Sequence, residues 1–327
     1  MALPSPSKEL QEQATSLIDL LAQGCDSNGC FGSFSSVAYD SAWVSLVQKE
    51  DGGVKQWRFP ECFQYLLDAQ RPDGGWLSSA ATYASAVDAI LNVLAALLAL
   101  KRHLAEPLNC TIPSDLNSRI SKATVFLQDQ LQKWDVEASE NVGFEILVPT
   151  LLQLLEQEGV NFKVPGLPTL KGLKKKKLAK FDPQMLYESG QTRLTLVHSL
   201  EAFVGKIDFD KVGHLKASGS MMASPAATAA YLIYSSNWDE EAEQYLSTVI
   251  ATGSGKGGGG VPSAFPTPIF ELSWVLSTLL LAGFSKEGLG CENVRIVGDF
   301  LEHHLHAAND LLGFGKQPRI MWLKSTY

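Results

Sequence analysis

The hydrophobic residues of this chain recur with the spacing of α-helices along most of its length. Apolar side chains stand at positions i, i+3 and i+4, which places them on one face of a helix. No convincing run of alternating apolar and polar residues competes with this pattern, so we predict an all-α protein. The predicted helices span Leu10–Leu21, Glu61–Ala69, Tyr83–Leu100, Asn117–Lys133, Val148–Glu158, Gln191–Val204, Ala226–Ser235, Glu240–Ile250, Ile269–Ala282 and Val294–His306.

Gly-rich turns punctuate this helical pattern in a weakly repeating way. They lie at residues 73–76, 213–225 and 257–262, and an apolar helix follows each of them. Such a cadence is typical of helical hairpins that stack into a barrel, because each hairpin buries its apolar face only against its neighbours.

Residues 160–190 interrupt the cadence with Pro165, Pro168 and a basic run that includes Lys174 and Lys175. We interpret the run as a solvated connecting loop. The alternative is an electrostatic contact of these lysines with a diphosphate group or with another domain.

Composition narrows the class of protein further. Of the 327 residues, 45% are hydrophobic and 19% are charged, which is typical of a well-buried globular protein, and the net charge of −8 gives no reason to expect a nucleic-acid partner. The longest apolar stretch, Ala89–Leu100, is too short to span a bilayer, and the start of the chain has no apolar signal core. The five cysteines have no metal-type spacing. We therefore predict a soluble, cytoplasmic protein without a membrane span.

The most specific sequence block lies between residues 36 and 76. It reads Ser-Val-Ala-Tyr-Asp-Ser-Ala-Trp-Val at 36–44, Phe-Pro-Glu-Cys at 59–62 and Gln-Arg-Pro-Asp-Gly-Gly-Trp at 70–76. The last segment is a turn between an apolar helix and a tryptophan that restarts the hydrophobic pattern. The block resembles the N-terminal half of class II diterpene cyclases, above all the fungal bifunctional copalyl diphosphate/ent-kaurene synthases.

Further segments carry the same resemblance in the family's order. They lie at residues 142–149, 197–203, 219–229 and 265–274, so that the resemblance covers roughly residues 30–315. It implies a helical α-α barrel, the γ domain of terpene cyclases, at residues 31–290. Residues 1–30 and 291–327 would then be incomplete pieces of the adjoining β domain.

The resemblance also implies an activity. Enzymes of this family protonate the terminal alkene of geranylgeranyl diphosphate, which closes into the two rings of copalyl diphosphate while the diphosphate stays in place. This chemistry needs a strong general acid, a dry apolar cavity, a base that ends the cascade, and diphosphate binding assisted by a cation, here Mg²⁺.

The family's general acid belongs to an Asp-x-Asp-Asp motif that follows a Gly-Phe-Ala-Pro-like segment. In this chain Leu-Leu-Gly-Phe at 311–314 reaches that point, and the basic residues 315–327 continue without the motif. We therefore expect no cyclisation by the chain as written. The alternative function is a non-catalytic remnant or a prenyl diphosphate-binding or partner module, associated with a separate or missing class I domain.

Two residues are candidates for the base that ends the cascade. His198 lies in a Leu-His-Ser-like motif, which in ent-specific relatives helps to hold the water that removes the last proton. In plant relatives the partner of this histidine is the Asn of a Pro-Asn-Val motif, and Ser263 stands at that position, so either Ser263 serves or the partner lies elsewhere. A lone histidine near an apolar helix is usually structural, so the base and the structural interpretations of His198 both stay open.

The third candidate site is acidic. Asp135, Glu137 and Glu140 lie where relatives carry a magnesium and diphosphate motif, and carboxylate oxygens suit this hard cation. The alternative is an exposed acidic loop. Lys174 and Lys175 are the diphosphate contacts that the electrostatic interpretation of the basic run predicts.

Overall fold

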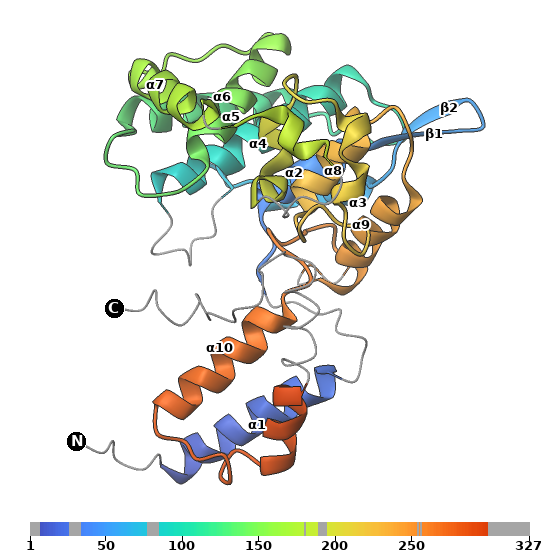
Figure 1. The fold of residues 1–327 in the computed structure, drawn as a ribbon. Coiled ribbons are helices and arrows are strands. Elements are labelled where there is room, and N and C mark those ends of the chain that lie inside the picture. Colours follow the sequence, from blue (N-terminus) through green and yellow to red (C-terminus); the bar gives the residue numbers. More distant parts are fainter. Residues whose placement is uncertain are drawn as a thin grey trace. The chain divides into compact units, whose positions relative to one another are not determined.

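The computed structural model describes residues 7–25, 34–76, 85–179, 181–188, 195–253, 255 and 257–299. The chain divides into two compact units. The main unit comprises Phe34–Ser189 and Thr195–Phe265, and the small unit comprises Met1–Ser33, Gly190–Leu194 and Pro266–Tyr327. Figure 1 shows their helices in the colours of the sequence.

The main unit is built almost entirely of helices. Its α-helices are α2 (Ala38–Ser45), α3 (Pro60–Ala69), α4 (Ala86–Ala105), α5 (Leu116–Lys133), α6 (Phe144–Gln157), α7 (Leu167–Leu178), α8 (Pro225–Tyr234) and α9 (Glu240–Thr252). Short 3₁₀ helices connect α7 to α8: η1 (Pro183–Leu186), η2 (Thr195–Phe203), η3 (Phe209–Lys211) and η4 (Gly213–Leu215). The predicted all-α class is confirmed.

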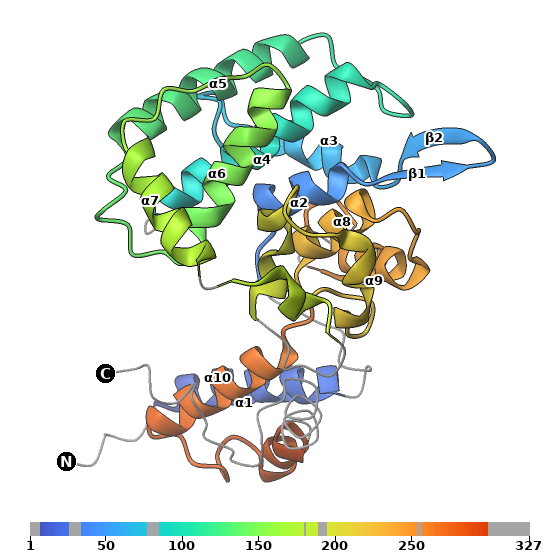
Figure 2. The same cartoon turned by 45° about the horizontal axis from the view of Figure 1, so that its top comes forward.

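Two helices form the centre of the main unit. The helix α4 begins with a capping box, in which Ser85 and Asp88 exchange side-chain and backbone hydrogen bonds. Each residue of Leu94–Leu100 is at most 1% exposed, and together these residues cover all faces of the helix, so other elements surround it here. It packs against α2, α5 and α6, and α2 in turn packs against α3 and α8 (Figures 1 and 2).

The segment 70–76 forms the predicted turn, and it connects α3 to α5. Trp76 is 7% exposed, and its indole Nε1 donates a hydrogen bond of 2.8 Å to the carbonyl of Leu66 in α3. Gly74 has a φ of 97°, and a Cβ there would lie 2.4 Å from the carbonyl oxygen of Lys122 in α5. Only glycine allows both this conformation and this approach.

Within the described part of the main unit, a β-hairpin adds two short strands to the predicted helices. Strands β1 (Gln48–Asp51) and β2 (Val54–Trp57) pair antiparallel, and Figures 1 and 2 show them projecting from the helices. The two residues between the strands, Gly52 and Gly53, both have positive φ, as a type I′ turn requires. Asp-Gly-Gly was the signal for this turn, but the largely polar strands gave no apolar alternation.

Two expectations about local structure were wrong. The basic run is helical rather than a loop: α7 has Pro168 in its first turn, where proline is tolerated, and it buries Leu170 completely. The predicted helix Gln191–Val204 is instead η2, which is kinked at Ser199 (φ −127°, ψ 44°). The start of that prediction at 191–194, Tyr83 and residues 300–306 lie outside the described residues.

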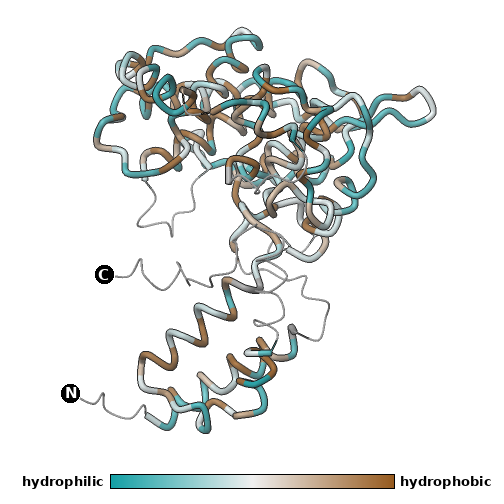
Figure 3. Tube along the Cα trace, viewed as in Figure 1, coloured by the Kyte–Doolittle hydropathy of each residue, from teal (hydrophilic) through white to brown (hydrophobic). Residues whose placement is uncertain are grey.

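The small unit pairs α1 (Lys8–Cys25) with α10 (Pro268–Leu281), and residues 291–299 are also helical. Ile18, Leu272, Leu289 and Val297 are fully buried in its apolar cluster. Figure 3 shows the apolar positions recurring along α10. Among the residues that the structure describes, no helix combines the length and the apolar character needed to cross a membrane. The predicted domain boundaries at residues 30 and 290 stay a prediction.

Candidate functional site

His198 lies half-buried in η2, with one ring nitrogen fixed by the backbone. Its Nδ1 is 3.0 Å from the carbonyl oxygen of Met222. A carbonyl oxygen only accepts hydrogen bonds, so Nδ1 carries the proton of this contact. In the uncharged ring Nε2 then holds a lone pair, which is what an acceptor of a proton or of a water hydrogen needs.

The turn that accepts this hydrogen bond has an uncommon backbone. Met222 and Ala223 have φ values of 51° and 57°, in the left-handed region that non-glycine residues rarely adopt. The carbonyl of Ala223 accepts a hydrogen bond of 2.8 Å from the backbone N–H of Phe265. Adjacent carbonyls of one turn therefore hold His198 on one side and the segment 261–265 on the other.

Ser263 lies in that segment and is exposed. Its neighbour Pro262 pairs with Ser36 in an isolated β-bridge, and Phe265 binds the turn. Through the carbonyls of Met222 and Ala223, the structure thus connects the segments of both predicted base residues to the same turn. The roles of His198 and Ser263 stay predictions.

Two buried acids, Asp40 in α2 and Glu201 in η2, lie close to this arrangement, and neither is among the predicted site residues. They are 4% and 3% exposed. Burial raises the pKa of Glu201 to about 7. Burial, together with the negative charge of Glu201, raises the pKa of Asp40 well above its usual range. The signal available in the sequence for Asp40 was a charged residue inside a short segment of small and apolar residues.

Each buried acid has one principal partner. The hydroxyl of Tyr39 donates a hydrogen bond of 2.8 Å to Oε1 of Glu201, and Oδ1 of Asp40 accepts one of 3.2 Å from the backbone N–H of Ala226. The other oxygen of Glu201, Oε2, is buried without a hydrogen-bond partner. Unpartnered buried oxygens are costly, so this place in the fold is not optimised for stability alone.

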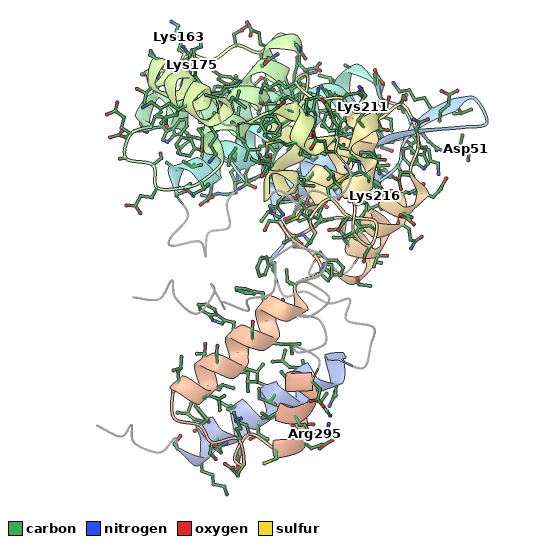
Figure 4. All side chains as sticks on the ribbon, in the orientation of Figure 1. Asp51, Lys163, Lys175, Lys211, Lys216 and Arg295 are labelled. Carbon is green, nitrogen blue, oxygen red and sulfur yellow. The ribbon has the colours of Figure 1, made fainter. Side chains whose placement is uncertain are left out.

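The predicted diphosphate lysines differ in their surroundings. Lys175 is exposed, and Figure 4 shows it on α7 at the outer edge of the main unit. Lys174 is half-buried and faces Lys206, whose pKa is lowered to about 8 by burial and by the charge of Lys174. Two ammonium groups in proximity favour an anion beside them. The assignment of Lys174 and Lys175 to diphosphate binding stays a prediction.

The predicted magnesium ligands do not converge. Asp135, Glu137 and Glu140 are all exposed, and Oδ1 of Asp135 accepts backbone N–H groups of Glu137 (3.0 Å) and Ala138 (3.2 Å). Within the described part of the chain, no group of three or more His, Cys, Asp or Glu side chains is arranged to hold a metal ion. These carboxylates therefore form no preassembled Mg²⁺ site, and magnesium stays a prediction.

Comparison with known proteins gives the context of this geometry. No family model matches the chain. The phyllocladan-16-alpha-ol synthase of Phomopsis amygdali is 47% identical over 310 residues, which are 94% of this chain and 30% of that protein. The copalyl diphosphate synthase of Talaromyces verruculosus is 47% identical over 308 residues, 94% of this chain and 31% of that protein.

A solved structure has the same fold. The ent-copalyl diphosphate synthase from Arabidopsis thaliana, in complex with (S)-15-aza-14,15-dihydrogeranylgeranyl thiolodiphosphate, matches with a TM-score of 0.70 and 26% identity. The match covers 90% of this chain and 39% of that one.

The helical fold and this structural likeness define the class: the chain has the α-α barrel fold of terpene cyclases, as predicted. The sequence relatives, at 40–47% identity, define the family more closely. The chain matches the copalyl diphosphate and ent-kaurene synthases among the diterpene cyclases over 93–94% of its own length, which confirms the resemblance. It spans about a third of the length of the curated relatives it matches.

Proposed function

We propose that this chain forms the part of a class II diterpene cyclase that holds geranylgeranyl diphosphate and removes the last proton of its cyclisation to copalyl diphosphate. One observation carries the proposal: the chain matches a copalyl diphosphate synthase at 47% identity over 94% of its length. The Arabidopsis thaliana relative was solved with a geranylgeranyl thiolodiphosphate, which supports the substrate class.

The proposed chemistry is an isomerisation in which one proton enters and one proton leaves. Protonation of the terminal alkene forms a tertiary carbocation, the neighbouring double bonds close two rings, and a base then takes a proton from the bicyclic cation. His198 is the proposed base, acting directly or through a water, because the Met222 carbonyl leaves Nε2 as its acceptor.

The proton donor has to come from another polypeptide segment. The 327 residues contain no Asp-x-Asp-Asp run. The chain by itself would bind the substrate without protonating it, and our expectation of no cyclisation by the chain alone stays a prediction. General acid catalysis contributes about 10²–10⁴ in rate, and an unactivated alkene depends on it strongly.

A chimaera tests the proposal. This chain replaces the matching 308 residues of the Talaromyces verruculosus copalyl diphosphate synthase, and the product is identified by mass spectrometry after dephosphorylation. We expect copalyl diphosphate from the chimaera and a loss of about 10²-fold or more in kcat on His198→Ala. His214→Ala, which alters an exposed histidine of the same unit, is the control and should change nothing. A folded chimaera without product, or an unaffected His198→Ala, would refute the proposal.

Binding without catalysis is the second candidate, favoured by the facing ammonium groups of Lys174 and Lys206. Calorimetric titration of the chain with geranylgeranyl diphosphate, with and without Mg²⁺, measures it. Lys174→Gln should weaken binding, whereas Lys211→Gln, an exposed lysine of η3, should not. Equal affinities of both variants would contradict the lysine assignment. A cytoplasmic location and a separate class I partner remain further predictions.

A further inference from the structure

We propose that three consecutive residues of α2, Tyr39, Asp40 and Ser41, are positioning residues for the candidate base His198. Each of them holds, by a hydrogen bond that we call a tie, a different one of the three segments that surround His198. The role of the base rests on the proposed function, whereas the three ties are features of the fold. The first segment is η2, the second is the turn before α8, and the third is the segment 261–265.

The first tie holds the element that carries His198. The hydroxyl of Tyr39 donates a hydrogen bond of 2.8 Å to Oε1 of Glu201, three residues after His198 in η2. Ser199, between them, has non-helical angles, so the regular hydrogen bonds of a helix do not fix the direction of His198. The side-chain contact of Glu201 supplies that constraint from outside the element.

The second tie holds the turn that accepts the hydrogen bond of His198. Oδ1 of Asp40 accepts a hydrogen bond of 3.2 Å from the backbone N–H of Ala226, in the first turn of α8. Met222 and Ala223, with their positive φ, lie directly before this helix start. Left-handed non-glycine residues persist only where their surroundings hold them, and Asp40 is part of that restraint.

The third tie holds the segment that contains Ser263. Oγ of Ser41 accepts a hydrogen bond of 3.0 Å from the backbone N–H of Val261, and the N–H of Val37 donates one of 2.9 Å to the carbonyl of Val261. The same segment reaches the turn through Phe265, whose N–H binds Ala223. Ser41 thus fixes the register of 261–265 against α2.

The three ties share one rigid origin. The helix α2 buries seven of its eight residues, so it cannot move without repacking the centre of the main unit. If Tyr39, Asp40 and Ser41 had a purely structural role, their buried polar groups would need hydrogen-bond partners, but these partners would not have to lie in other segments. Ser45 shows that this can be done within the helix, because its Oγ donates to the carbonyl of Ala42 at 2.7 Å.

The test observes His198 directly in the full chain. Nuclear magnetic resonance of protein labelled with ¹⁵N-histidine reports which ring nitrogen carries the proton, and His198→Gln assigns the signal. We expect the Nδ1–H form in the wild type. Tyr39→Phe, Asp40→Ala and Ser41→Ala should each lower the ratio of Nδ1–H to Nε2–H by about fivefold, the effect of one hydrogen bond.

Matched controls separate positioning from general damage. Ser45→Ala removes a hydroxyl from the same helix, and Asp40→Asn keeps the acceptor oxygen, so both should preserve the wild-type signal of His198. His103 is buried, and its Nε2 lies 3.0 Å from the carbonyl oxygen of Ser45 at the end of α2, so its signal reports whether α2 stays packed and should be unchanged throughout. Unchanged His198 signals in the folded tie variants, or equal changes at His103, would overturn the proposal.

Loss of folding is also informative. If Tyr39→Phe, Asp40→Ala and Ser41→Ala all fail to fold, these residues serve folding, and the positioning role is refuted. The result is independent of the chemistry, because the signal of His198 is measured without substrate. If the tie variants shift the tautomer of His198 but the chimaera makes no product, the three ties are supported and the proposed function is refuted. If the chimaera makes product but the tautomer does not shift, the proposed function is supported and the ties are refuted.

Discussion

The carboxylate of Glu243 joins the β-hairpin to α9, and removing its charge gives the sharpest test of the main unit's energetics. Glu243 is 6% exposed. It accepts hydrogen bonds from Nζ of Lys49 (2.6 Å), from Nε1 of Trp238 (2.7 Å) and from Nε of Arg58. Lys49 lies in β1, Arg58 directly follows β2, and Trp238 lies just before α9. One carboxylate of α9 therefore binds both strands of the hairpin region and the segment that leads into its own helix.

The pKa of Glu243 gives the magnitude. Burial opposes ionisation, but the hydrogen bonds of Lys49, Arg58 and Trp238 outweigh it and lower the pKa from 4.5 to about 2. Each pKa unit corresponds to about 1.4 kcal/mol, so the ionised carboxylate stabilises the fold by about 3 kcal/mol. Because the folded pKa is depressed, this contribution is complete above pH 4.5 and is lost as the pH falls through about 2.

Glu243→Gln should therefore lower the free energy of unfolding by about 3 kcal/mol near neutral pH. Urea denaturation at about pH 7 and at about pH 3 measures this, and the difference between the two proteins should shrink at the lower pH. The control is Glu240→Gln, because Glu240 contacts the same Lys49 at 3.5 Å but is 77% exposed. Its effect should stay below about 1 kcal/mol. A loss at Glu243 that is equally small, or independent of pH, would refute the reasoning.

Three further predictions concern stability. Burial lowers the pKa of His103 to about 4, so stability should fall by about 3 kcal/mol as the pH drops from 6.5 through 4; urea denaturation of His103→Gln should lack this dependence. Burial raises the pKa of Glu201 to about 7, so stability should fall as the pH rises from 4.5 through 7; Glu201→Gln should match the wild type near pH 4.5 and exceed its unfolding free energy above pH 7. Ala223→Gly relieves the strain of a positive φ, so it should raise the free energy of unfolding by about 1 kcal/mol, measured as a higher melting temperature.

The helices were predictable from the sequence because their apolar spacing is strong and local. The limits α5 (Leu116–Lys133) and α9 (Glu240–Thr252) differ little from the predicted ones. The helix α7 was missed because its lysines dominate the pattern, although Pro168 and Leu170 carried the signal of a helix start and a buried face. In this segment the spacing of the apolar residues is a better indicator of structure than the density of charge.

The candidate site was predictable only in part. The motif around His198 selected the residue, but the sequence gives no means of finding the carbonyl of Met222, 24 positions away, as its partner. The contact of Tyr39 with Glu201 spans 162 positions and depends on packing between distant elements. The acidic residues 135, 137 and 140 show the converse: they are near in sequence and all exposed, yet among the described residues no group of three or more such side chains is arranged to hold a metal ion.

Several kinds of physical irregularity occur together around His198, whereas elsewhere in the main unit they occur singly, as at the unpartnered buried nitrogens of Trp43 and His103. Elsewhere, α4 is capped and buried along its middle, and the carboxylate of Glu243 is fully paired. Around His198, by contrast, two adjacent residues have left-handed angles, η2 is kinked, and Glu201 is buried with an unpartnered oxygen. Each feature costs stability that a simple structural core would not spend. Because local rules are broken together mainly where a site must be held in one geometry, this turn is where function is expected.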